Sequence, residues 1–170
     1  GFSMKYFISF LVVIIISLGF LTIDSEAQQS TTLILVRHAE KVDDSADPDL
    51  SPEGVSRATV LKNMLSTTGV TAVYSTDFIR TRKTCGPTAD FYGLELKIYS
   101  HRNASDLDDI LRQNLGGVVL VCGHSNSTPR AANHYLGEQK FEDFDESDYG
   151  NLMFLNFKGE GSPTVLRIRY

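Results

Sequence analysis

Two arginine and two histidine side chains carry the chemical signal of this sequence. Arg37 and His38 are adjacent, Arg80 comes later, and His124 follows Gly123. Guanidinium groups bind phosphate oxygens through planar pairs of N–H donors. An imidazole can attack phosphorus when its other ring nitrogen is held by a hydrogen bond, and a second imidazole can donate to a non-bridging oxygen as charge shifts. Such a set suits transfer of a phosphoryl group to histidine and then to water, and this chemistry needs no metal or other cofactor.

Each of these residues comes after a segment that is predicted to be a β-strand. The stretch "TTLILVRHAE" contains a continuous apolar strand over residues 32–36, of the kind that is buried on both faces. A second short strand, "VTAVYSTD", precedes Arg80, and "GVVLVCGHS" runs into His124. Ligands of parallel α/β sheets bind at the carboxyl ends of the strands. We therefore expect the four side chains to meet at one edge of a sheet.

Predicted helices alternate with these strands. "SPEGVSRATVLKNMLSTTG" begins with Ser51 as N-cap and Pro52 at the first helical position. Further helices are predicted over "FIRTRKTCGPTADFYG", which Pro87 kinks or divides, over "ASDLDDILRQNLGG", capped by Ser105, and over "STPRAANHYLG". "LELKIY" adds a strand, and "NLMFLNF" and "TVLRIRY" form a closing hairpin. The pattern indicates an α/β three-layer sandwich with a mostly parallel central sheet, helices on both faces and antiparallel closing strands.

Three motifs in this order resemble those of the histidine phosphatase superfamily, which is also called phosphoglycerate-mutase-like. They are "LVRHAE", "YSTDFIRTRKT" and "LVCGHSN", and each lies at a predicted strand end. The segment "LSPEGVSRA" between the first two is similar to the pattern with which the family opens its first helix. The resemblance extends from Thr32 to the closing strands. It implies an α/β fold and phosphate chemistry on a histidine.

The resemblance implies catalytic roles for the four residues introduced above. His38 would be the nucleophile that becomes phosphorylated, and the phosphate would be held by Arg37, Arg80 and His124. Many members of the family carry Gly after the first His, and this chain has Ala39 there, which is a small change.

Three further positions match residues that support or line the substrate site in the family. Glu40 stands at the family's common acidic position and would orient an Arg or the nucleophilic His. Asn126 would shape the floor of the pocket through hydrogen bonds, and Ser75 would do similar work behind the site.

The resemblance does not assign the proton donor. Mutase-like members carry a Glu in a stretch that corresponds here to "SHRNASDLDD", which contains none. Our hypothesis is that Asp43 or Asp44, in the loop after the first strand, protonates the leaving group, because a carboxylate near phosphate has a raised pKa. The alternative is that this Asp-rich loop is simply solvated.

The short chain between Arg80 and His124 favours a phosphatase over a mutase. A helix, a strand and a helix fill this stretch and leave no room for a large cap, so the pocket should be shallow and open. The expected function is hydrolysis of a small phosphomonoester. Two alternatives stay open: a phosphohistidine protein phosphatase, which fits the size but not export, and a non-catalytic phosphate-binding module of the cell envelope.

Some residues receive no role or an open one at this stage. His101 matches no motif, and a surface or packing role is expected for it. The acidic segment "FEDFDESDYG", residues 141–150, is either a solvated loop or a lid whose Tyr149 or Phe144 touches the substrate. Lys41 is expected to be an ordinary solvated charge, and the alternative is a cation at the pocket rim that attracts the substrate.

Residues 1–27 are predicted to lie outside the folded domain. "GFS" before Met4 looks like a cloning scar, and Lys5, an uncharged apolar run and "SEA" fit a secretory signal peptide. The alternative is an uncleaved membrane anchor. Residues 28–170 then form one domain that is exported to the periplasm or the extracellular space, without stable membrane insertion after cleavage.

Charge and cysteine content limit the partners. The chain has a net charge of −5, and removing residues 1–27, with their one basic and two acidic residues, leaves about −4. Nucleic-acid binding is not expected of a domain with this acidity.

Cys85 and Cys122 are predicted to be two small buried thiols, although an exported protein could pair them. Neither has metal-ligand spacing around it. The expected partner is a small phosphorylated substrate, and the oligomeric state is left open.

Overall fold

The central sheet has six strands in the order β3-β2-β4-β1-β5-β6. The computed structural model describes residues 30–159 and 161–170, so the predicted scar and signal peptide lie outside the described residues. The first four strands in this order run parallel, β5 pairs antiparallel with β1, and β6 pairs antiparallel with β5. The strands are β1 (Thr31–Arg37), β2 (Ala72–Ser75), β3 (Leu96–Ile98), β4 (Val118–Gly123), β5 (Asn151–Phe157) and β6 (Thr164–Arg169).

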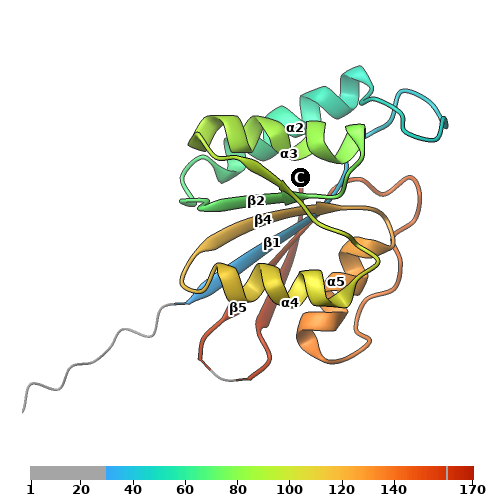
Figure 1. Ribbon diagram of the computed structural model, residues 1–170. Coiled ribbons are helices and arrows are strands. Elements are labelled where there is room, and N and C mark those ends of the chain that lie inside the picture. Colours follow the sequence, from blue (N-terminus) through green and yellow to red (C-terminus); the bar gives the residue numbers. More distant parts are fainter. Residues whose placement is uncertain (1–29, 160) are drawn as a thin grey trace, which may run out of the picture.

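Helices cover both faces of the sheet, which confirms the predicted three-layer sandwich (Figure 1). α2 and α3 lie on one face, and α4 and α5 lie on the other (Figure 1). The helices are α2 (Pro52–Leu65), α3 (Ile79–Tyr92), α4 (Ala104–Gln113) and α5 (Ser127–Leu136). Between Arg80 and His124 the chain forms only α3, β3, α4 and β4, so the expectation that this stretch holds no large cap is confirmed.

The uninterrupted apolar run of β1 is explained by its position between β4 and β5. Leu33 and Leu35 pack into the core on the side of α4 and α5, and Ile34 and Val36 pack into the core on the side of α2 and α3. All four side chains are buried. A strand that is held on both edges and both faces gives its last residue a fixed position, and that residue is Arg37.

Two helix details differ from the sequence expectations. α4 is capped by Asn103, whose side chain accepts from the backbone N–H of Ser105, so the prediction of Ser105 as the cap was wrong by two residues. α3 runs as one helix through Pro87 and ends at Gly93, which has the left-handed conformation of a helix C-cap. None of the helices in residues 30–159 and 161–170 is long and apolar enough to span a membrane.

Cys85 and Cys122 are buried free thiols, as expected.

Candidate active site

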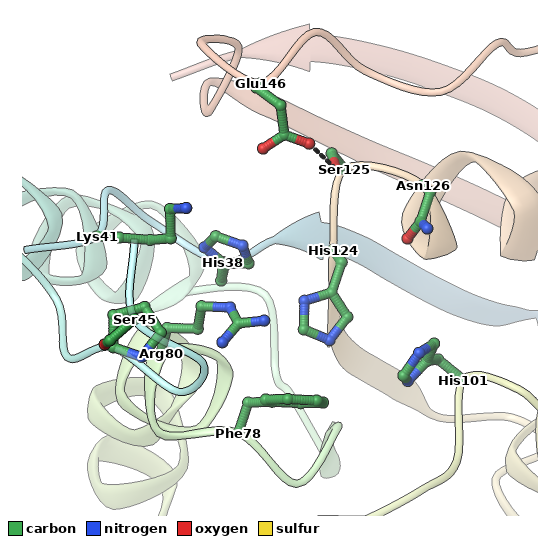
Figure 2. Close-up of a pocket in the computed structure, with 11 residues that line it drawn as sticks. His38, Lys41, Ser45, Phe78, Arg80, His101, His124, Ser125, Asn126 and Glu146 are labelled. Atoms are coloured by element: carbon green, nitrogen blue, oxygen red, sulfur yellow. Dashed lines mark hydrogen bonds between the residues drawn. The ribbon is translucent and has the colours of Figure 1, made fainter. Parts of the chain in front are cut away.

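The carboxyl ends of β1, β2 and β4 meet in one pocket, as the strand-end rule predicts. The backbone N–H of His38 donates to the Gly123 carbonyl at 2.9 Å, which continues the β1–β4 pairing one residue past the strand. This contact brings His38 beside His124, with ring centroids 5.5 Å apart. Figure 2 shows both imidazoles between Arg80 and Glu146. The pocket is lined by His38, Lys41, Ser45, Pro48, Phe78, Arg80, His101, His124, Ser125, Asn126 and Glu146.

His38 has the properties of a nucleophile. Its Nδ1 lies 2.8 Å from the carbonyl oxygen of Ala39, and because a carbonyl can only accept, this nitrogen carries the proton. Burial, opposed by this hydrogen bond and helped by the charges of Arg37 and Arg80, lowers the pKa of His38 to about 4. At neutral pH the ring is therefore uncharged, and Nε2 keeps an unprotonated lone pair.

His124 is held by a chain of hydroxyl groups. Its Nε2 lies 3.0 Å from the hydroxyl of Thr76, which donates onward to the hydroxyl of Thr81 at 3.0 Å. Since Thr76 uses its only hydroxyl proton in this way, it accepts from the Nε2–H of His124. Burial, followed by the neighbouring His38 and Arg80, lowers the pKa of His124 to about 3. His124 is thus an oriented, neutral imidazole beside the nucleophile.

Arg80 presents unpartnered donors to the pocket. It lies in the first turn of α3, and its guanidinium packs over the ring of Phe78 at 4.5 Å from the centroid. Its buried Nε and Nη1 make no hydrogen bond, and Oδ1 of Asp47 lies 3.5 Å from Nη1. Buried N–H groups of this kind normally have a partner, so these two indicate an anion-binding position.

The guanidinium of Arg37 was expected to bind phosphate, but most of its N–H groups donate to other residues of the protein. Nη1 donates to the carbonyl oxygens of Asp145 and Asp148, and Nη2 donates to the carbonyl oxygen and Oε2 of Glu146, at 2.8–3.1 Å. The guanidinium also lies over the ring of Tyr149, 4.1 Å from the centroid. Only the buried Nε has no partner. In this structure Arg37 therefore keeps one buried N–H without a partner, and its remaining donors hold the turn of residues 145–148.

Glu146 is a pocket residue that the sequence analysis missed. Its Oε1 accepts from the Ser125 hydroxyl at 2.7 Å, and its Oε2 accepts from Arg37 at 2.9 Å. Figure 2 shows the carboxylate on the side of the pocket that faces Arg80 and Phe78. The acidic segment 141–150 thus touches the site through Glu146 and Tyr149, and Phe144 is buried in the core instead.

Three of the predicted supporting residues are placed in different ways. Asn126 lines the pocket, as expected. Glu40 pairs with Arg57 of α2, whose Nε donates to both carboxylate oxygens at 2.9 Å, so it holds an Arg, as one of the two expectations had it, and makes no hydrogen bond with His38. Ser75 is buried behind the pocket, and its hydroxyl donates to the carbonyl oxygen of Thr76.

The two aspartates that we considered as general acids lie outside the pocket wall. Asp43 is exposed and accepts from the backbone N–H of Ser45. Asp44 is 95% exposed at its side chain and pairs with Lys41 at 2.8 Å. Lys41 itself lines the pocket, which corrects the expectation of an ordinary solvated charge.

His101 is the second residue whose role the sequence analysis missed. It follows β3 and lies in the pocket, with its ring centroid 5.0 Å from that of His124. The signal for it was present, because the strand-end rule that selected His38 and His124 also applies to β3. Within the described residues no group of three or more His, Cys, Asp or Glu side chains is placed to hold a metal ion.

Fold and site together define an α/β protein whose pocket at the strand ends presents an uncharged, oriented imidazole beside Arg80. Residues 33–103 match the model of the histidine phosphatase superfamily (branch 1). The chain is similar to this superfamily over these residues, and its class is that of a phosphatase. No curated protein sequence matches the chain significantly.

Solved structures of phosphatases share this fold. A phosphoserine phosphatase from Entamoeba histolytica, in complex with 3-phosphoglyceric acid, has a TM-score of 0.65 at 16% identity, over 82% of this chain and 97% of that chain. A mycobacterial glucosyl-3-phosphoglycerate phosphatase has a TM-score of 0.68 at 12% identity, over 83% and 98%. A protein assigned as the phosphohistidine phosphatase SixA, from Nakamurella multipartitia, has a TM-score of 0.61 at 21% identity, over 82% and 96%. At these identities the likeness shows the fold alone.

Proposed function

We propose that this protein hydrolyses a phosphomonoester through a phosphohistidine intermediate on His38, without a metal ion. One observation carries the proposal. The unprotonated Nε2 of a neutral, buried His38 lies in the same pocket as Arg80, whose buried Nε and Nη1 make no hydrogen bond, and Arg37, the residue before His38, also keeps a buried Nε without a partner. A phosphate group would satisfy these donors and bring its phosphorus atom to the imidazole.

The pocket residues divide the work of phosphoryl transfer. Arg80 and the Nε of Arg37 hold the phosphate, and Lys41 supplies a further positive charge at the pocket wall. The negative charge of the bound phosphate raises the pKa of His124, whose imidazolium then stabilises a non-bridging oxygen as the bond to His38 forms. Water then attacks the phosphohistidine and releases inorganic phosphate.

The proposed substrate is a small organic phosphate. The residues that the structure describes form no cap domain, and the pocket wall carries two uncharged His rings and Phe78 beside the cations. Two of the structurally similar proteins are named for small phosphorylated compounds, phosphoserine and glucosyl-3-phosphoglycerate.

We also propose that the domain is exported, because residues 4–27 begin with a basic residue, continue with an apolar run and end with small residues. N-terminal sequencing of protein recovered outside the cytoplasm tests export, because an intact N-terminus or retention in the cytoplasm would contradict it.

The test of the proposal compares the wild-type protein with His38→Ala on an aryl phosphate, with and without a chelator. We expect turnover that the chelator leaves intact and the substitution abolishes, together with an acid-labile, base-stable phosphoenzyme in the wild type alone. Tight binding of inorganic phosphate without turnover would instead identify a binding module. Turnover of a phosphohistidine protein in the absence of activity on small phosphomonoesters would identify a protein phosphatase. Either result would contradict the proposal.

A further inference from the structure

The pocket wall contains a carboxylate for which the phosphate-binding steps above have no use. Among the residues that line the pocket in the described part of the chain, Glu146 is the only one with a carboxyl group. Its side chain is 78% exposed, so the carboxylate is open to a ligand although both of its oxygens have partners. Those partners are Ser125, which follows His124, and Arg37, which precedes His38. Glu146 is thus tied to both strand ends that supply the imidazoles.

Hydrolysis of an alkyl phosphate requires a proton donor, and the two imidazoles that act on the phosphate already use their protons elsewhere. The leaving alkoxide is a strong base and needs a proton as the P–O bond breaks. The Nδ1 proton of His38 is directed to the Ala39 carbonyl, and the Nε2 proton of His124 is directed to Thr76. The second proton that His124 takes up with the phosphate is directed to a non-bridging oxygen. Asp43 and Asp44 do not line the pocket. We propose that Glu146 is the general acid and base of the reaction, an inference that rests on the proposed function.

The contact between Glu146 and Arg37 explains how the carboxylate acquires its proton. In the structure the hydrogen bond from Ser125 and the charge of Arg37 lower the pKa of Glu146. Partial burial acts in the opposite direction, but the net result is a pKa below the usual value of a glutamate. A phosphate dianion that binds beside Arg37 competes for the same positive charge and adds negative charge next to the carboxylate. Both effects raise the pKa of Glu146. Substrate binding therefore converts Glu146 from an ion-pair partner into a proton donor.

The two half-reactions balance with Glu146 as the only proton carrier. In the first, Nε2 of His38 forms a bond to phosphorus, the P–O bond to the leaving group breaks, and the leaving oxygen takes the proton of Glu146. In the second, the Glu146 carboxylate takes a proton from water as the water oxygen bonds to phosphorus and the P–N bond breaks. The products are an alcohol and inorganic phosphate, and Glu146 is protonated again.

The test compares Glu146→Gln with the wild type on an alkyl phosphate and on p-nitrophenyl phosphate. The value of kcat/KM reports the first half-reaction for both substrates. General acid catalysis contributes about 100-fold or more, so we expect kcat/KM for the alkyl phosphate to fall by about that factor. Because p-nitrophenolate leaves without a proton, its kcat/KM should fall less than about tenfold. Water attack also loses its base, so the phosphoenzyme should accumulate in Glu146→Gln. Glu142→Gln makes the same change at an exposed position of the same segment and should match the wild type.

Several outcomes would overturn the assignment. Equal losses on both substrates would mean that Glu146 only positions Arg37, and unchanged or increased rates would mean that it has no acid role. A leaving-group-dependent loss in Asp43→Asn or Asp44→Asn, with Glu146→Gln normal, would place the acid in the other loop. Failure of the proposed function is a separate result, because the wild type would then form no phosphoenzyme from either substrate.

Discussion

The backbone N–H of Ala39 donates to the hydroxyl of Thr84 at 2.9 Å, and that hydroxyl donates to the Arg80 carbonyl at 2.7 Å. The carbonyl of Ala39 in turn accepts from Nδ1 of His38. One threonine therefore links the helix that supplies Arg80 to the residue that orients the nucleophile. We infer that the position of Arg80 relative to His38 depends on this contact.

Replacing this threonine tests the link. We expect Thr84→Val to lower the free energy of unfolding by about 1–3 kcal/mol, because the buried N–H of Ala39 loses its partner. We also expect kcat/KM to fall by about tenfold or more, because His38 is less firmly placed. Urea denaturation and steady-state kinetics measure the two effects.

Thr88→Val is the matched control for this prediction. Thr88 lies one turn further along α3, is equally buried, and its hydroxyl makes no hydrogen bond. Its replacement should leave stability unchanged or raise it, because an unpaired buried hydroxyl is removed. Equal effects of the two substitutions would show that the contact with Ala39 has no special importance.

The two neutral imidazoles make the stability of the protein depend on pH. An unfolded histidine binds a proton near pH 6.5, and in the folded protein the pKa of His38 is about 4 and that of His124 about 3. As pH falls from 6.5 towards 4, the unfolded state takes up protons that the folded state does not, so stability falls. A shift of this size at one histidine corresponds to on the order of 3 kcal/mol.

Unfolding in urea at pH 7 and at pH 4.5 measures this dependence. We expect the loss of unfolding free energy between the two pH values to be clearly smaller in His38→Gln than in the wild type, because one of the two sites no longer titrates. The same loss in both proteins would mean that His38 titrates normally in the folded state. Activity should also decline below about pH 4 as Nε2 of His38 becomes protonated.

The strand ends were predictable from sequence because local patterns determine them. Apolar runs followed by Arg37-His38 and by Gly123-His124 identify buried strands, and the strand-end rule then places both imidazoles at one edge. The same rule would have found His101 after β3. These inferences need only local sequence and the general geometry of parallel sheets.

The role of the acidic segment could not be predicted in this way. Glu146 contacts Arg37 although the two residues are 109 positions apart in the sequence. It lies in a turn, where no helical or strand pattern of apolar residues indicates which way a side chain points. Glu40 shows the opposite problem. It is close to His38 in sequence, but the chain turns after the strand and directs its carboxylate to Arg57. Side-chain direction in loops depends on contacts between distant segments, which one sequence does not reveal.

Replacing Gly54 with alanine tests the close contact between α2 and the chain after β1, because the contact and helix propensity predict opposite changes in the free energy of unfolding. A Cβ atom at this position would lie 2.3 Å from the carbonyl oxygen of Glu40 and 3.1 Å from its backbone nitrogen. Since both atoms belong to the backbone after His38, α2 must move to relieve the overlap. We expect Gly54→Ala to destabilise the fold by about 1–3 kcal/mol and to lower activity. Helix propensity alone predicts stabilisation by about 1 kcal/mol, so a more stable variant would refute the close contact.

Arg80 provides the most direct test of phosphate binding. Its buried Nε and Nη1 make no hydrogen bond, although Oδ1 of Asp47 lies 3.5 Å from Nη1, and a planar guanidinium can present more than one N–H donor to a phosphate. Lysine keeps the charge but supplies a single point donor, so we expect Arg80→Lys to weaken inhibition by inorganic phosphate by about tenfold, the equivalent of one charged hydrogen bond. Arg82→Lys is the control, because Arg82 lies on the same helix and pairs with Asp77 outside the pocket. Equal inhibition constants for Arg80→Lys and the wild type would show that the charge alone binds the anion, and that the two unpartnered donors do not contribute.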